Sequence, residues 1–200
     1  MVPALVDVHD PGLTGGVQNQ PDFQAGAADH RTHFANEVPR FVRQAMQEYA
    51  HLTGRKYNPI KSFLSDDAQD VLVGMGSVNY DAEAVSIYLR RQGKKVGVVS
   101  VKLLQPFPEA ELVEVLRGKK AVTVLERSDA TTLTNLVTQA LFKARENDAQ
   151  IRHRGIPSIH QFPKISTALF GLGAHDLQPR HLIAACENMD CETNIPFYFL

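Results

Sequence analysis

The sequence predicts an α/β fold in which an open, mainly parallel sheet carries helices on both faces. Between residues 70 and 145, short β-branched apolar runs alternate with segments that have helical character. The strands of a parallel sheet are buried on both faces and therefore read as continuous apolar runs. Their regular alternation with helices is typical of right-handed crossover connections. The length of 200 residues and the hydrophobic content of 44% suit one such domain with an additional segment.

The chain is expected to begin with an irregular arm over residues 1 to about 35, followed by one helix. No period of 2 or 3.6 residues persists in the arm, which is punctuated by Pro3, Pro11, Gly12, Gly15, Gly16, Pro21 and Gly26. From Asn36 onward, apolar residues recur at spacings of three and four, which predicts an amphipathic helix that Asn36 caps and Gly54 ends. We therefore expect residues 1–60 to form the arm and the helix, with a connector over 55–67, and residues 61–200 to form the α/β domain.

The elements of the α/β domain follow in a regular order. The predicted strands are 70–74, 96–101, 121–125, 156–161 and 196–200, and the predicted helices are 82–92, 108–116, 133–144 and 179–187. The last strand is apolar and stands at the end of the chain, which is unusual unless it pairs inside a sheet. We therefore expect the chain to be a piece of a longer polypeptide.

Composition excludes several classes of partner and site. The net charge of -1 provides no basic surface for nucleic acid or for an anionic membrane. No stretch approaches the roughly 18 apolar residues needed to cross a bilayer, and the start has no basic segment followed by an apolar run, so a cytoplasmic location is expected. Cys186 and Cys191 are too few for a zinc or iron–sulfur site, and the histidines match no metal-binding spacing.

A glycine-containing turn follows the first predicted strand, at Gly74, Met75, Gly76 and Ser77. Parallel sheets often bind anionic groups at this position, through backbone N–H groups and the dipole of the following helix. A dinucleotide fingerprint would require glycine at the position of Asn79, and a P-loop would require Gly-Lys-Ser/Thr. The turn therefore has two interpretations, a phosphate-binding loop or a sharp turn that lets the helix pack closely, and the incomplete fingerprint favours the second.

Polar residues also follow the third predicted strand, at Glu126 and Arg127. The carboxyl edge of an open parallel sheet is where ligands and neighbouring domains usually bind. Alternatively, the two side chains form an ion pair with each other, which would carry no functional information. No G-x-S-x-G segment is present, and no pair of acids stands out, so no catalytic residue is predicted.

Two blocks of the sequence closely resemble the pyruvate:ferredoxin (flavodoxin) oxidoreductases. Residues 71–78 read VLVGMGSV, similar to the family's V-A-M-G-S-V, and residues 93–108 read GKKVGVVSVKLLQPFP, similar to G-x-K-V-G-x-V-x-V-x-L-x-R-P-F. Gln105 replaces the arginine that is common before Pro106 and Phe107. Glu126-Arg127-Ser128 corresponds to the family's D-R-T.

Further segments resemble the same family in the same order. Residues 14–22 are similar to R-G-T-A-Q-N-P-D and residues 51–57 to L-T-G-R-x-Y, both at the end of the family's pyrimidine-binding domain. Residues 163–165 match P-K-I, and residues 170–179 are similar to Y-G-L-G-S-K-E-F-x-P. The resemblance thus covers nearly the whole chain.

The resemblance implies a transketolase C-terminal-like domain (domain II), preceded by the end of the pyrimidine-binding domain. Enzymes of this family oxidise pyruvate with coenzyme A, using thiamine diphosphate, magnesium and iron–sulfur clusters, and reduce ferredoxin or flavodoxin. No motif for these cofactors is present in the chain, so we expect it to bind none of them, to be inactive alone and to hold neighbouring domains or subunits of a homo-oligomeric holoenzyme. The expected contact residues are Gly74, Gly76, Ser77, Gln105, Pro106, Phe107, Glu126 and Arg127.

Two alternatives remain open at this point. Subunits of fungal sulfite reductases contain a similar domain. The chain could also be a free-standing nucleotide- or flavin-binding module that uses the turn from Gly74 to Ser77.

Overall fold

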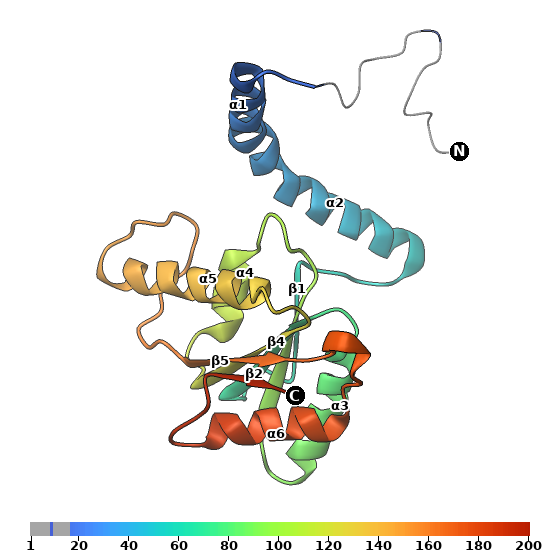
Figure 1. The fold of residues 1–200 in the computed structure, drawn as a ribbon, viewed down its shortest axis with the longest axis vertical. Helices are drawn as coiled ribbons and strands as arrows, with labels where there is room; N and C mark the ends of the chain where they lie inside the picture. The colour runs from blue at the N-terminus through green and yellow to red at the C-terminus, as the bar shows by residue number, and fades with distance from the viewer. Residues whose placement is uncertain (1–8, 10–16) are drawn as a thin grey trace. The chain divides into compact units, whose positions relative to one another are not determined.

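A computed structural model describes residue 9 and residues 17–200 (Figure 1). The chain divides into two compact units, of which the first ends at Gln44 and the second begins at Ala45. In the first part of the chain, helix α1 (Gln20–Asp29) continues through a π-helical turn (His30–Phe34) into helix α2 (Ala35–Thr53). Gly54, with φ of +71°, follows α2 and ends it, as predicted.

The predicted irregular arm is wrong for residues 20–34. Asn19 caps α1, since its side-chain oxygen accepts the N–H of Asp22 at 3.1 Å. Pro21 lies in the first turn, where its missing N–H is not needed. Asn36 does not start a new helix, and its Nδ2 donates instead to Thr32 O at 2.8 Å. Residues 1–8 and 10–16, which include the first part of the predicted arm and the start of the 14–22 motif, lie outside the described residues.

The second unit contains a six-stranded, mainly parallel sheet with the order β1-β3-β2-β4-β5-β6, which confirms the predicted fold class. The strands are β1 (Ile60–Phe63), β2 (Asp70–Met75), β3 (Val96–Val101), β4 (Ala121–Glu126), β5 (Lys164–Leu169) and β6 (Phe197–Phe199). Only β1 runs antiparallel to its neighbour, with Ile60 opposite Val101, and every other pair is parallel. Strand β1 was not predicted, because four residues with two exposed positions give almost no apolar run.

Helices cover both faces of the sheet, as expected (Figure 1). They are α3 (Val78–Arg91), α4 (Glu109–Leu116), α5 (Thr132–Ala149) and α6 (Pro179–Asp190). One core cluster joins alternate strand residues such as Val71 and Val124 to α4 and α5. The other cluster joins residues such as Leu72 and Leu125 to α3 and α6. This division follows from the alternation of side chains along each strand.

The predicted strand at 156–161 is wrong, and β5 begins three residues later, at Lys164. Residues 156–161 form a loop that the buried side chain of Asn147 holds, with Nδ2 donating to His153 O at 2.8 Å and to Ile156 O at 2.9 Å. Ile159 is 2% exposed, and its N–H donates to Ala144 O at 3.1 Å. The apolar residues of this segment thus pack on α5 without joining the sheet. No helix of the described part of the chain is long and apolar enough to span a membrane.

Candidate functional site

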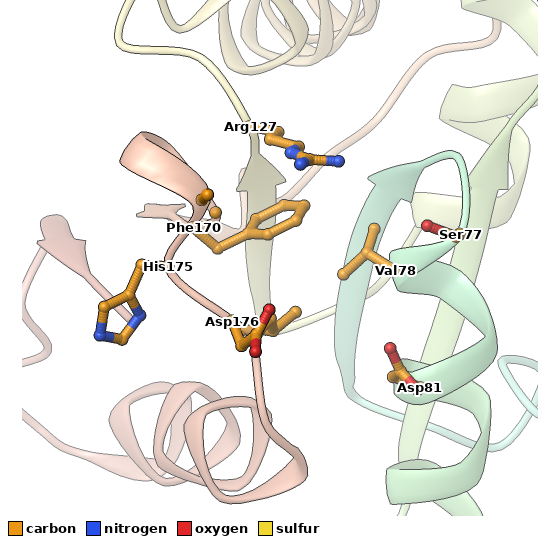
Figure 2. Close-up of a pocket in the computed structure, with 10 residues that line it drawn as sticks. Ser77, Val78, Asp81, Arg127, Phe170, His175 and Asp176 are labelled. Atoms are coloured by element: carbon orange, nitrogen blue, oxygen red, sulfur yellow. The ribbon is translucent and has the colours of Figure 1, made fainter.

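The carboxyl ends of β2, β4 and β5 surround a crevice with a volume of about 240 Å³ (Figure 2). Strand β2 is connected through α3 to β3 on one side, and β4 is connected through α5 to β5 on the other. The connections therefore diverge between β2 and β4, which is the position where open parallel sheets usually bind their ligands. The crevice is lined by Ser77, Val78, Asp81, Arg127, Phe170, Gly171, Ala174, His175, Asp176 and Leu177.

The two glycines of the β2–α3 turn are required by the packing and the conformation of the backbone there. A Cβ atom at Gly74 would lie 2.8 Å from Asn79 Oδ1 and 3.2 Å from Val78 Cγ1, so glycine lets α3 start close to the strand. Gly76 has a φ of +81°, a conformation that favours glycine. Both observations agree with the packing interpretation of this turn.

Asn79 explains why the turn departs from a dinucleotide fingerprint. Its side chain lies under the turn and is buried, and its Nδ2 donates to Gly76 O at 3.1 Å. The space that a third glycine would leave open is therefore filled by an amide. Ser77, in contrast, is exposed at the start of α3 and makes no capping hydrogen bond with its side chain.

Glu126 stabilises the start of α5. The residue is 5% exposed, and its Oε1 accepts the N–H of Thr134 at 2.6 Å, in the first turn of the helix. Its carbonyl accepts the N–H of Phe170 at 2.9 Å. The alternative of an ion pair between Glu126 and Arg127 is wrong within residues 17–200, because these consecutive side chains point in different directions, Glu126 toward α5 and Arg127 into the crevice.

Arg127 is exposed in the crevice and has no hydrogen-bond or ion-pair partner among the residues that the structure describes. Its side chain lies close to Gly171, where an added Cβ atom would be 3.1 Å from Arg127 Nε. Figure 2 shows the guanidinium beside the ring of Phe170, with Asp81 and Asp176 farther down the crevice. The charged groups are thus close enough to share one crevice and do not neutralise one another.

Gln105, Pro106 and Phe107 follow β3 and do not line the crevice. Gln105 is exposed, and it is joined to Pro106 by a cis peptide bond. Phe107 packs partly buried against the core cluster under α4 and α5. Of the eight predicted contact residues, only Ser77 and Arg127 line the crevice. Gly74 and Gly76 shape the turn that precedes Ser77.

The sequence-based prediction missed Asp81, Phe170, His175 and Asp176. Three of them lie in residues 170–179, a segment whose similarity to Y-G-L-G-S-K-E-F-x-P was a usable signal. It could not be placed at the crevice because the preceding strand was assigned to the wrong residues. Three segments that resemble the family, after β2, β4 and β5, thus meet at one place.

The residues do not fit a metal centre or an iron–sulfur cluster. Within the described ranges, no group of three His, Cys, Asp or Glu side chains could hold a metal ion. Cys186 is buried, and burial raises the pKa of its thiol to about 12, which disfavours the thiolate that a cluster needs. Among the described residues no base is hydrogen-bonded to Ser77 Oγ.

Comparison with known proteins agrees with this architecture. Residues 68–154 match the family model "Pyruvate:ferredoxin oxidoreductase core domain II". The pyruvate synthase subunit PorA of Thermotoga maritima is 27% identical over 188 residues, which cover 92% of this chain and 44% of that subunit. A putative pyruvate-flavodoxin oxidoreductase of Synechocystis is 29% identical over 195 residues, which cover 94% of this chain and 15% of that protein.

A solved structure has a similar fold. It is the 2-oxoglutarate:ferredoxin oxidoreductase from Magnetococcus marinus with 2-oxoglutarate, coenzyme A and succinyl-CoA bound, with a TM-score of 0.55 and 18% identity, covering 89% of this chain and 25% of that chain. The chain spans less than half the length of the curated relatives described above. The family match and these relatives together show that residues 68–154 form a core domain II of the pyruvate:ferredoxin oxidoreductase type.

Proposed function

We propose that this chain is a non-catalytic scaffold within a 2-oxoacid oxidoreductase that reduces ferredoxin or flavodoxin. The observation that carries the proposal is the match of residues 68–154 to core domain II, which coincides with β2, β3, β4 and their connecting helices. The relatives are more than twice as long as the matched region. Their names refer to pyruvate and, for another relative, to ketoisovalerate, and they give no support to a sulfite reductase.

The cofactor chemistry is assigned to other polypeptide. Thiamine diphosphate, magnesium, iron–sulfur clusters and coenzyme A are implied for the holoenzyme by the family, and residues 17–200 of this chain do not fit a cluster or a metal. A parallel sheet without a phosphate fingerprint is better suited to hold catalytic domains in position than to catalyse. We propose that the holoenzyme is cytoplasmic and contains more than one copy of its subunits.

The carboxyl edge of the sheet is the proposed contact surface for the remaining domains or subunits. Of the eight residues predicted from the sequence, Ser77 and Arg127 line the crevice and Gln105 is exposed after β3. Arginine is enriched at protein interfaces, where its guanidinium forms directional hydrogen bonds. Glu126 contributes indirectly, since its carboxylate is already bound to the start of α5.

A tagged copy expressed from its own chromosomal locus tests the proposal. We expect polypeptides with thiamine diphosphate and cluster-binding segments to co-purify, identified by mass spectrometry, and the complex to reduce viologen with a 2-oxoacid and coenzyme A. The purified 200-residue chain should show no such activity. Activity of the isolated chain, or a complex without these segments, would contradict the proposal.

The alternative of a nucleotide- or flavin-binding module has less support. The crevice of about 240 Å³ is below the range of roughly 300–1,000 Å³ that is usual for ligand pockets. Asn79 fills the space under the turn. Calorimetric titration with coenzyme A, FMN and NAD(P) is expected to give no saturable signal.

A further inference from the structure

The charged groups of the crevice differ from other charged groups of the sheet because they have no partners. Arg127, Asp81 and Asp176 form no hydrogen bond or ion pair with any residue described by the structure. Asp81 lies in the first turn of α3, where its charge favours the helix dipole. Arg127 and Asp176 have no such role within the chain, although a single bare surface charge is common.

The charges are also separated in space. In Figure 2 the guanidinium of Arg127 lies at one side of the crevice, next to Phe170, and the carboxylates of Asp81 and Asp176 lie at the opposite side. Ser77 lies at the start of α3, the helix that also carries Asp81, and its hydroxyl and the positive end of the helix dipole favour an acidic group. The crevice thus has an end that attracts anions and an end that attracts cations.

The apolar residues between the two ends suit side-chain stems. Phe170 and Val78 lie between Arg127 and Asp81 in Figure 2. The aliphatic stems of Glu, Lys and Arg pack on such surfaces while their charged heads reach polar partners. A volume of about 240 Å³ accommodates side chains of a docked segment more readily than a cofactor.

From this charge complementarity we infer that the crevice receives a polypeptide segment of the same oxidoreductase that places an acidic side chain on Arg127 and a basic side chain between Asp81 and Asp176. The inference rests on the proposed function and specifies the partner chemistry at its contact surface. The occupant is a segment of the polypeptide that the relatives carry beyond the matched region, since this chain covers 44% of the PorA subunit. Opposite charges on the two sides of an interface fix its register and raise its rate of formation.

Charge reversal in the native assembly tests the inference. Arg127→Glu is expected to weaken association of the co-purified complex at least about tenfold, because it opposes two like charges at a buried contact. The double variant Asp81→Asn/Asp176→Asn should weaken it by a smaller factor and reduce its dependence on salt. Arg154→Glu is the matched control, since this exposed arginine makes the same charge change in the loop after α5, outside the crevice.

The outcomes separate the two proposals. Urea unfolding of each isolated variant verifies folding, and Arg127→Ala serves if Arg127→Glu unfolds. If the wild-type chain associates with no other part of an oxidoreductase, the proposed function itself fails. If it associates and Arg127→Glu binds as tightly as Arg154→Glu, the scaffold role stands and the inferred charge contact is wrong.

Discussion

The two edges of the sheet differ in how many of their charged side chains have partners within the chain. At the amino edge, where the parallel strands begin, charged groups are held by partners within the chain. Asp67 bonds to Arg90 and Lys95, and Lys94 bonds to Asp190. At the carboxyl edge, Arg127 lacks such a partner among the described residues. Arg127 is therefore available to a partner, whereas Glu126 at the same edge is held by the start of α5.

The pKa shifts follow the same division. Four of the six described groups with a displaced pKa lie at or near the amino edge, and burial raises the pKa of the other two, Cys186 in α6 and Tyr198 in β6. Hydrogen bonds from Arg90 and Lys95 hold the pKa of Asp67 well below its usual range, and burial raises the pKa of Asp70. Burial lowers the pKa of Lys119, whereas the hydrogen bond to Asp190 raises that of Lys94. At the amino edge, the displaced pKa values thus come from hydrogen bonds within the chain or from burial.

The largest expected loss of stability comes from Gly97→Val, which disrupts the packing at the amino edge. A Cβ atom at Gly97 would lie 2.7 Å from Ser65 Cα and 2.9 Å from Ser65 Cβ, and backbone cannot move aside easily. We expect a loss of about 3 kcal/mol in the free energy of unfolding, measured by urea titration. Ser62→Thr, which adds a methyl group at an exposed position of β1, should change stability by less than about 0.5 kcal/mol. Equal effects of the two variants would contradict the close packing of the 65–68 loop.

Lys119→Met removes a buried charge from the same edge. Lys119 is 7% exposed, and its Nζ donates to Ser65 O at 2.5 Å and to Ala68 O at 2.9 Å. Without the ammonium, two carbonyls lose their donor, so we expect a loss of about 2 kcal/mol by urea unfolding. The neighbouring exposed Lys120→Met is the control and should be nearly neutral.

Glu126→Ala tests whether a charged side chain at the carboxyl edge stabilises the fold. Its carboxylate accepts the N–H of Thr134, so removal leaves the first turn of α5 without this cap. We expect a loss of about 1 kcal/mol, and Glu126→Gln, which keeps an acceptor oxygen, should lose less. Thermal unfolding followed by circular dichroism measures both variants. If the alanine variant is as stable as the wild type, the carboxylate of Glu126 does not stabilise the fold.

Asp67→Asn should give the smallest change, with a defined pH dependence. The folded-state pKa of Asp67 lies below its ordinary value of about 3.9, so its ionised form stabilises the fold above that pH and loses this effect as pH falls through the folded pKa. The variant should therefore be less stable than the wild type at pH 7, and the difference should shrink below about pH 4. Urea unfolding at pH 7 and pH 3 checks this. A difference that grows on acidification would have the wrong sign.

Much of the sheet could be predicted from the sequence, because buried parallel strands leave apolar runs. Residues 96–101 were assigned with the correct bounds, and the strands beginning at Asp70 and Ala121 were within one residue. Strand β5 was missed because Ser166 and Thr167 interrupt its apolar character, although both are buried. Helix α1 was missed because Pro21 and Gly26 read as breakers, and their positions within a helix depend on the cap at Asn19.

The candidate site was predicted only in part. The edge of the sheet and two crevice residues, Ser77 and Arg127, follow from the position of each strand end. Asp81 and Asp176 did not, because a surface carboxylate in a helix or loop looks the same in sequence whether or not it faces a cavity. The capping role of Glu126 also depends on the approach of Thr134 in α5, which lies eight residues farther along the chain.

Hydrogen exchange, compared between the isolated chain and the purified holoenzyme, tests the contrast between the two edges most directly. We expect exchange to slow on assembly in residues 76–81, 127–131 and 171–177, around the crevice. Residues 64–70 and 117–120, at the amino edge, should exchange at the same rate in both samples. Slower exchange at the amino edge, with an unchanged crevice, would show that the partner contacts the opposite side of the sheet.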